Sequence, residues 1–252
     1  MGTAVGSCLT GQGHEVLWAS AGRSEQTAGR AKTAGLTDAR TAAAIAGRAA
    51  VIISVCPPHA AIEVARSVAG FDGIYLDANA IAPRTSRQVA AIVTAGGATY
   101  VDGGIIGPPP VASGSTRLYL SGSRAGEICA LFEGTTLDAR IAGTDLWSAS
   151  AVKMAYASWT KGSAALLLAA RALAEAEGVG AVLTAEWALS QPGLDARHQA
   201  AERSAASKGW RWTAEMTEIA ATMGSARLPE GFHLAAADMF GRFPRSNQDP
   251  SG

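Results

Sequence analysis

Four short polar stretches in this 252-residue chain carry the side chains best suited to bind a ligand, and each follows an apolar run. They are residues 20–24, 56–59, 77–79 and 102–107. In an open parallel sheet the ligand lies beyond the carboxyl ends of the strands, where the residues that follow each strand contact it. If the apolar runs are strands of one such sheet, the four stretches line one binding site.

The first stretch is suited to bind a phosphate. Ser20-Ala21-Gly22-Arg23-Ser24 has no acidic residue until Glu25, whereas enzymes that prefer NAD tend to place a carboxylate here for the ribose hydroxyls. A guanidinium donates in a fork to phosphate oxygens, and the serines add hydroxyl groups. The stretch therefore favours the 2′-phosphate of NADP. A solvated loop arginine is the alternative.

The other three stretches contain a rigid turn, a side-chain amide and glycines that allow a ligand to come close to the backbone. Pro57 and Pro58 stiffen the turn after Cys56. The amide of Asn79 is both donor and acceptor, and it either contacts the ligand or caps the helix that follows. The glycines among residues 102–107 allow a ligand to approach the backbone. Cys56 has no neighbouring base in the sequence, so we expect a small buried side chain rather than a nucleophile.

The elements that must position these stretches alternate along the chain up to about Ser150. The β-rich runs are HEVLWAS, AVIISVCPP, GIYLDANA, ATYVDGG and TRLYLSG, and Ala-rich helical stretches separate them. This alternation predicts an α/β, Rossmann-like, doubly wound and mostly parallel sheet. Beyond it, helical patterns continue to near Phe240. We therefore expect a nucleotide-binding domain at residues 1–148 and an all-α domain at residues 149–252, with a frayed tail after Phe243.

The opening MGTAVGSCLTGQGHEVLWAS has the pattern of the second half of a dinucleotide-binding βαβ unit, in which a helix is followed by a strand. No strand precedes Met1. We expect that the first strand and part of the glycine-rich turn are missing, and that roughly ten more residues precede an internal Met1. A chain that has lost its first strand is the alternative.

Composition limits the partners and the compartment. Lys plus Arg and Asp plus Glu each number 21, so the neutral charge balance calls for neither nucleic acid nor an anionic membrane, and favours a small-molecule partner. Three cysteines and four histidines lack metal-ligand spacing, which predicts no metal and a reducing cytoplasm. The most apolar segment, SAALLLAARALA, is too short for a membrane span, and the chain lacks a basic, then apolar leader.

Several of these motifs resemble those of one enzyme family. Met1-Gly2, Leu9, Gly13-His14 and Val16 have the spacing seen in β-hydroxyacid dehydrogenases, which include 6-phosphogluconate and 3-hydroxyisobutyrate dehydrogenases, and CPPH, LDANAIAP and VDGGIIGPPP resemble the later motifs. The segment KGWRWTAEMTEIAATMGSARLPEGFH resembles a poorly characterised C-terminal helical domain of 6-phosphogluconate-dehydrogenase-like proteins. The resemblance covers nearly the whole chain and implies an NAD(P)-binding oxidoreductase.

The resemblance also implies roles for individual residues. Lys153 stands at the position of the family's catalytic lysine and would act as general acid or base, with Asn79 orienting. Without the resemblance, a lysine on a solvated helix face is the alternative. The implied cofactor contacts are Gly2, Thr3, Ser20, Arg23, Ser24, Val55, Cys56, Pro57 and Asn79. The implied substrate contacts are Gly104, Ile105, Ile106, Gly107 and Tyr156.

The chain departs from the family at two polar anchors. Ile106 replaces a serine, and Tyr156 and Ala157 stand where the family has an Asn or His-Asn, which puts the usual hydroxy-acid reaction in doubt. Lys161 is a weaker catalytic candidate. Glu215 and Glu218 either orient Lys153 or cover a solvated face, the more frequent case.

The predicted activity is hydride transfer between NADP, or NAD, and an alcohol or carbonyl. An imine-reductase-like enzyme and a non-catalytic dimeric scaffold are the alternatives. Family members commonly form homodimers through the helical domain, which the resemblance therefore implies here. Two further groups belong to that domain. Trp210, Met216, Ile219 and Met223 form a buried stripe, while Phe232, His233 and Phe240 line a pocket or pack a dimer.

Overall fold

The computed structural model describes residues 1–243, so the predicted frayed tail lies outside the described residues. By its internal contacts the chain divides into two compact units, residues 1–154 and residues 155 onward. The division falls within the first two turns of α7 (Ser148–Ala176), close to the domain boundary that the sequence predicts.

The first unit contains two sheets. The strands β1 (Leu17–Trp18) and β2 (Thr37–Asp38) form a parallel pair. The larger sheet has the order β3-β4-β5-β6-β7, with bounds Val51–Ser54, Ile74–Asp77, Thr99–Ile106, Thr116–Ser121 and Leu137–Ile141. Its neighbouring strands are parallel except for β5 and β6, which are antiparallel. The mostly parallel sheet that the sequence predicts is confirmed.

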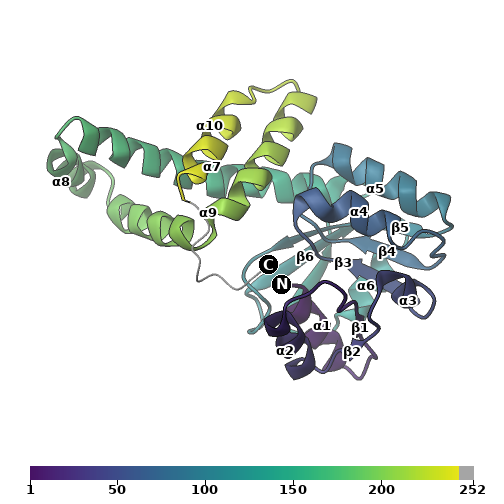
Figure 1. Ribbon diagram of the computed structural model, residues 1–252. Coiled ribbons are helices and arrows are strands. Elements are labelled where there is room, and N and C mark those ends of the chain that lie inside the picture. The colour runs from purple at the N-terminus through teal and green to yellow at the C-terminus, as the bar shows by residue number, and fades with distance from the viewer. Residues whose placement is uncertain (244–252) are drawn as a thin grey trace. The chain divides into compact units, whose positions relative to one another are not determined.

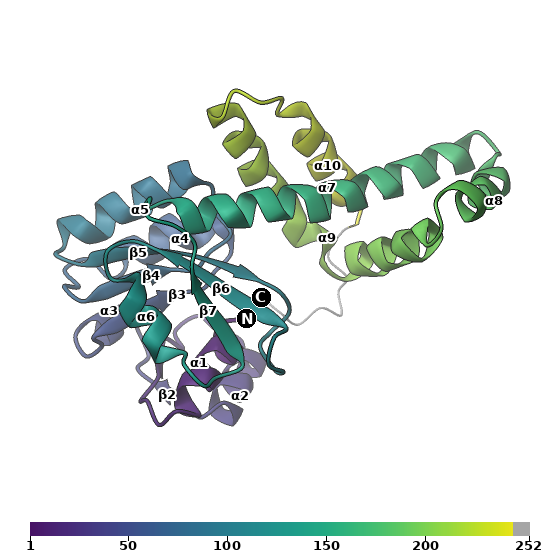
Figure 2. The same ribbon diagram turned by 180° about the vertical axis from the view of Figure 1, so that it is seen from behind.

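Helices cover both faces of the larger sheet. Successive residues of a strand point to opposite faces, so neighbouring apolar residues pack under different helices. Leu76 packs in the core under α1 (Gly2–Thr10) and α6 (Ala125–Leu131), whereas Tyr75 packs under α4 (Ala61–Arg66) and α5 (Pro83–Ala95). Figure 1 shows α4 and α5 together on one side of the sheet, and Figure 2 shows α6 beside β7 on the other. The remaining short elements are α2 (Glu25–Thr33), α3 (Ala42–Ala46) and the 3₁₀ turn η1 (Pro58–Ala60). The doubly wound arrangement is thus confirmed.

The two sheets stay separate, and β3 is an edge strand. In a Rossmann-type sheet the first strand pairs between the second and the fourth. Here α1 comes first and β1 second, as the sequence predicts, and within residues 1–243 no strand joins β1 to β3.

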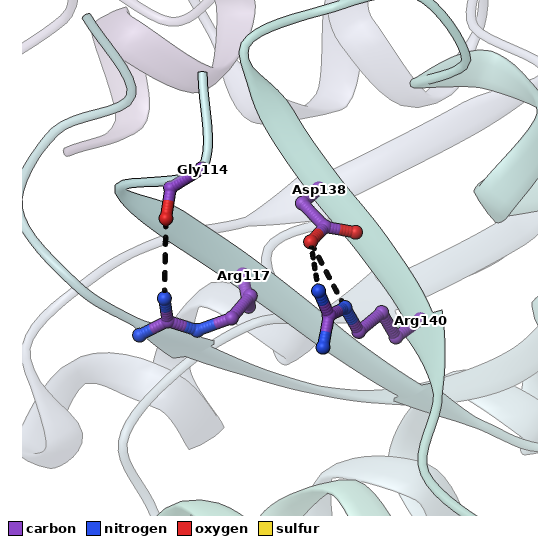
Figure 3. A network of polar contacts seen from close by, with 4 residues as sticks. All are labelled: Gly114, Arg117, Asp138 and Arg140. Carbon is purple, nitrogen blue, oxygen red and sulfur yellow. Dashed lines mark hydrogen bonds and ion pairs between the residues drawn. The ribbon is translucent and has the colours of Figure 1, made fainter. Parts of the chain in front are cut away.

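The opposite edge strand, β7, presents charged side chains (Figure 3). Arg140 donates to Asp138 Oδ2 from Nε at 2.9 Å and from Nη2 at 2.5 Å, and Arg117 on β6 donates to the carbonyl oxygen of Gly114 at 3.3 Å. The hydrogen bonds from Arg140 hold the pKa of Asp138 below its usual range. Charged residues on an edge strand oppose edge-to-edge association of sheets.

The second unit is helical, as predicted. It contains most of α7, then α8 (Gly180–Ser190), α9 (Leu194–Ser225) and α10 (Gly231–Gly241). Met216 and Ile219 on α9 are buried, which confirms the centre of the predicted apolar stripe, and Trp212 meets Phe240 on α10 edge-on at 5.0 Å between ring centroids. In the described part of the chain, no helix combines the length and the apolar character that a membrane span needs.

Candidate functional site

The candidate site lies in the first unit, where β3, β4 and β5 bring their carboxyl ends together. Ser54, Asp77 and Asp102 are register partners across these strands. A Cβ added at Gly2 would lie 3.7 Å from the Cβ of Val55, so the start of α1 lies beside the turn that follows β3. A Cβ added at Gly103 would lie 3.3 Å from the Cα of Ala78, after β4. Three of the four predicted stretches, those that follow β3 and β4 and the one within β5, therefore lie at the same end of this sheet.

Asn79 joins the turn after β4 to the turn after β3. Its Oδ1 accepts from the backbone N–H of Cys56 at 2.5 Å, and its Nδ2 donates to Ser54 Oγ at 2.9 Å. The side chain is buried, and the residue that caps α5 is Ala82, so the helix-cap interpretation of Asn79 is wrong. Because both ends of the amide are engaged, Asn79 fixes the shape of these turns.

Cys56 is half-buried in the same turn, and its pKa rises to about 11, chiefly through burial. The thiol therefore stays protonated at neutral pH and is a poor nucleophile. The positive charge of Arg23 acts on this thiol in the opposite direction, lowering its pKa. The guanidinium after β1 thus lies within electrostatic reach of the turn after β3.

The loop at residues 20–24 is held by the neighbouring strand. Ser24 caps α2, accepting from the N–H of Thr27 at 3.3 Å, and the N–H of Ala21 donates to the carbonyl oxygen of Arg40 at 2.8 Å. Asp38 on β2 bonds to the N–H of Arg40 and to Ser20, and these bonds hold its pKa below the usual range.

This carboxylate is not among the site residues predicted from the sequence. Asp38 belongs to the two-residue strand β2, both of whose residues are exposed, so hydrophobic periodicity gives no signal for it. Through its hydrogen bonds to Arg40 and Ser20, Asp38 braces the loop that carries Arg23.

Lys153 lies at the same end of the sheet. A Cβ added at Gly104 would lie 2.8 Å from the carbonyl oxygen of Ala149 and 2.9 Å from the Cβ of Lys153. The first two turns of α7 therefore rest directly on β5. This close packing explains the glycine at 104, which the sequence analysis attributed to ligand approach. Lys153 itself is half-buried.

The other predicted substrate contacts are placed differently. Ile105 and Ile106 are buried, at 8% and 3% exposure, and pair with β6, so neither presents an exposed side chain to a ligand. Gly107 has a φ of +124° and packs against the backbone of residues 115 and 116. Tyr156 is 48% exposed on α7. Their contact with substrate stays a prediction.

Two buried carboxylates lie beneath these turns. Burial raises the pKa of Asp77 to about 7 and that of Asp102 to about 6, and the charge of Asp102 adds to the shift of Asp77. Asp77 Oδ1 accepts from the N–H of Asn79 at 3.0 Å, so this carboxylate braces the loop after β4.

In the helical unit, Glu215 is buried and forms an ion pair with Lys161, whose ammonium lies 5.4 Å from the ring centroid of Trp212. The solvated face that the sequence analysis favoured for Glu215 is therefore wrong, because the lysine compensates the buried charge. His233 Nε2 and Ser158 Oγ lie 2.9 Å apart. The two phenylalanines that the sequence predicts to line a pocket or pack a dimer differ in burial. Phe240 is fully buried, and Phe232 is 76% exposed.

The residues of the first unit fit a nicotinamide dinucleotide in three respects. A nine-residue helix, α1, begins beside the turn after β3 and offers N–H groups for a pyrophosphate. Asn79 holds residues 55–57 in a stiff turn, which suits a flat ring. Arg23 offers a fork for a ribose phosphate. Among residues 1–243, no group of three His, Cys, Asp or Glu side chains is placed to hold a metal ion.

Two comparisons with known proteins rest on sequence. Residues 174–243 match the family model DUF1932, a domain of unknown function. A curated relative, an uncharacterised 28.5 kDa protein of Methanothermus fervidus, is 28% identical over 155 residues, which span 61% of this chain and 59% of the relative.

Solved structures match over nearly the whole chain. A conserved protein of unknown function, described as structurally similar to 3-hydroxyacid dehydrogenases, is 27% identical with a TM-score of 0.69, covering 96% of this chain and 92% of its own. Mycobacterium tuberculosis 3-hydroxyisobutyrate dehydrogenase with L-serine has a TM-score of 0.71 at 18% identity, covering 99% and 92%. A reductive aminase from Aspergillus terreus with NADPH and ethyl levulinate has a TM-score of 0.59 at 22% identity, covering 100% and 93%.

The last two likenesses concern the fold, and the first carries sequence similarity as well. Together with the match at residues 174–243, they confirm the resemblance that the sequence motifs indicate. In fold, the chain is similar to 3-hydroxyacid dehydrogenase-like proteins, and its residues 174–243 match a domain family of unknown function.

Proposed function

We propose that this protein is an NADP-dependent oxidoreductase that transfers hydride between the nicotinamide and a carbonyl or alcohol carbon of a small molecule, with Lys153 as proton donor or acceptor. The observation that carries the proposal is the packing of α7 on Gly104. It brings Lys153 to the end of the sheet where Val55 and Asn79 also lie.

The cofactor, when bound, supplies or accepts the hydride. The chain supplies the proton and the positions. In reduction, the ammonium of Lys153 donates a proton to the carbonyl oxygen as the carbon gains hydride, and in oxidation the neutral amine accepts the hydroxyl proton. Arg23 binds the ribose 2′-phosphate, and Asn79 keeps the turn at residues 55–57 rigid.

The substrate class follows from what replaces the family's polar anchors. Ile106 is buried and apolar at 3% exposure, so its side chain offers no hydrogen bond to a carboxylate or hydroxyl. This loss of a polar anchor favours a less hydrophilic substrate than a small hydroxy acid. The imine carbon is the alternative acceptor, and the fold likeness to a reductive aminase supports including it in the assays.

We also propose a homodimer through the helical unit and a cytoplasmic location. On α7, Trp159, Leu166 and Leu173 are exposed at heptad spacing, and Tyr156 precedes them by three residues on the same stripe. Such an apolar stripe on a helix is typical of an interface between chains. The three cysteines are free thiols, which suits a reducing compartment.

The test of the activity is the variant Lys153→Met, which keeps the length of the side chain and removes its proton. NADPH consumption is followed with a panel of aldehydes, ketones and imines, and NADPH affinity is measured separately by fluorescence. We expect turnover to fall at least roughly 100-fold, the usual contribution of a general acid, with NADPH affinity within about twofold of the wild type.

Lys208→Met removes an exposed lysine from α9 and is the matched control, expected to retain turnover. Unchanged turnover in Lys153→Met, in the presence of wild-type activity, would remove Lys153 from the mechanism. Equal losses in the two variants would point to damage unrelated to proton transfer.

A further inference from the structure

Asp102 on β5 is a fully buried carboxylate that grips the first turn of α7. Its Oδ2 accepts from the backbone N–H of Ser150 at 2.6 Å, and its Oδ1 accepts from Ser150 Oγ at 2.5 Å. Each carboxylate oxygen therefore takes one hydrogen bond from the same residue of the helix. Bidentate, charge-assisted contacts of this kind fix geometry as well as adding binding energy.

The other backbone N–H groups in the first turn of α7 also have hydrogen-bond acceptors. An N–H group without an acceptor at a buried helix start would destabilise the fold. The N–H of Ala149 donates to Ser121 Oγ on β6 at 3.0 Å. Those of Ser148 and Ala151 donate to the carbonyl oxygens of Asp145 and Trp147, each at 3.1 Å. Two of the four donors thus depend on side chains of the sheet.

Ser86 on α5 completes the arrangement, with its Oγ 3.0 Å from Ser150 Oγ. We call Asp102, Ser121, Ser150 and Ser86 the α7 seat. The partial positive charge of the helix N-terminus faces the carboxylate and favours its ionised form. The four residues come from four different elements, so the seat fixes the helix against the sheet rather than bracing a single loop.

Ser150, the α7 residue of the seat, lies about one helical turn before Lys153. Gly104, which packs against Lys153, lies two residues after Asp102 on β5. These two attachments hold the same short segment of α7, so a shift of the first turn moves the lysine. We propose that Asp102 is a positioning residue for Lys153, acting through Ser150. The proposal rests on the proposed function of Lys153, while the geometry of the seat stands apart from it.

The strength of the seat should depend on pH. The ionised carboxylate of Asp102 accepts a hydrogen bond at each oxygen, whereas the protonated form loses one acceptor. Burial raises the pKa of Asp102 to about 6. Tyr100 on β5 and Asp77 on β4 are the titratable groups that interact with it, and the surrounding elements also carry Tyr75, Arg84, Arg87, Arg117, Tyr119 and Lys153. Of these, Tyr100 donates to Asp102 Oδ1 at 3.4 Å, and Arg87 lies 5.2 Å over the ring of Trp147. The seat should hold above about pH 6 and loosen below it.

The test compares wild type with Asp102→Asn, which keeps the shape of the side chain and removes its charge. Amide hydrogen exchange in residues 148–154, corrected for the intrinsic rate, is measured between about pH 5 and pH 8. Labelling of Lys153 by acetic anhydride is quantified in the same samples. We expect wild-type protection to fall below about pH 6, and we expect Asp102→Asn to exchange roughly tenfold faster at pH 8 with no such pH step.

Thr135→Val is the matched control. It removes a part-buried hydroxyl that bonds only within its own turn, to Phe132 and Leu137. We expect it to leave exchange in residues 148–154 and labelling of Lys153 at wild-type values. Ser150→Ala, which removes only the hydroxyl half of the grip, gives an intermediate effect and keeps the test decisive if Asp102→Asn does not fold.

Turnover of the carbonyl panel adds a third readout, in which Asp102→Asn lowers kcat while NADPH affinity stays within about twofold. Identical exchange and Lys153 labelling in wild type and Asp102→Asn would overturn the proposal, and so would equal changes in Thr135→Val. If the seat responds as expected while Lys153→Met keeps full turnover, the function proposed for Lys153 fails and the seat geometry stands.

Discussion

Asp77 and Asp102 are the residues whose environment departs most from that of an ordinary carboxylate. Both are buried side by side on β4 and β5, and burial raises the pKa of each. For Asp77 the folded-state value of about 7 lies above the usual 3.8, so between these values the folded state binds a proton that the unfolded state releases. The contribution of Asp77 to stability is therefore present at low pH and is lost as pH rises towards 7.

The variant Asp77→Asn tests this sign. The neutral amide resembles the protonated acid at every pH, so the wild type should lose stability relative to the variant by up to about 3 kcal/mol between pH 5 and pH 8. Chemical denaturation at the two pH values gives the difference. Asp72→Asn changes an exposed carboxylate and is the control. A relative stability of wild type that rises with pH would contradict the burial argument.

At the scale of elements, the long apolar runs were predictable and the short polar strands were not. Val51–Ser54 and Ile74–Asp77 are strands because helices cover both of their faces, which makes their sequences continuously apolar. In β2 both residues are exposed, and β7 alternates weakly at an edge, so neither strand leaves a strong pattern. The antiparallel turn into β6 follows from a Pro- and Gly-rich loop whose direction no periodicity encodes.

The candidate site was predictable to the same extent. Strand ends are visible in the sequence, so Val55 and Asn79 could be placed at one end of the sheet. Lys153 was placed there by the family resemblance alone. The grip of Asp102 on Ser150 and the pairing of Lys161 with Glu215 join residues about fifty positions apart, and only the folded chain brings them together. Glycine at 104 illustrates the limit, because a residue suited to ligand approach also suits close helix packing.

The stripe on α7 carries the prediction at this scale. Leu166 is 70% exposed at its centre, so Leu166→Glu should weaken the proposed homodimer at least roughly tenfold by placing a charge in a desolvated contact. Sedimentation over a range of protein concentrations measures the change. Val111→Glu alters an apolar residue outside the helical unit that is 84% exposed, and it should leave association unchanged. A wild type that stays monomeric throughout would contradict the dimer.

For the whole molecule, the proposed function places a dinucleotide at the carboxyl ends of the strands and the proton donor on the first turns of α7. The first unit holds Arg23, the turn at residues 55–57 and Lys153, and each is fixed by neighbours rather than left on a mobile loop. The fold likenesses show a fold that a 3-hydroxyisobutyrate dehydrogenase shares, and residues 174–243 match a domain of unknown function. The non-catalytic scaffold differs from this account in one respect, since it requires no cofactor.

The measurement that tests the account most directly is a fluorescence titration of the protein with NADPH and with NADH, for wild type and Arg23→Ala. Wild type should bind NADPH more tightly, and the variant should lose roughly 10- to 100-fold in NADPH affinity, with NADH within about twofold, because charged hydrogen bonds to the phosphate contribute about 1.5–3 kcal/mol. Arg66→Ala on α4 should match wild type. Binding of neither cofactor by wild type would contradict the account and favour the scaffold.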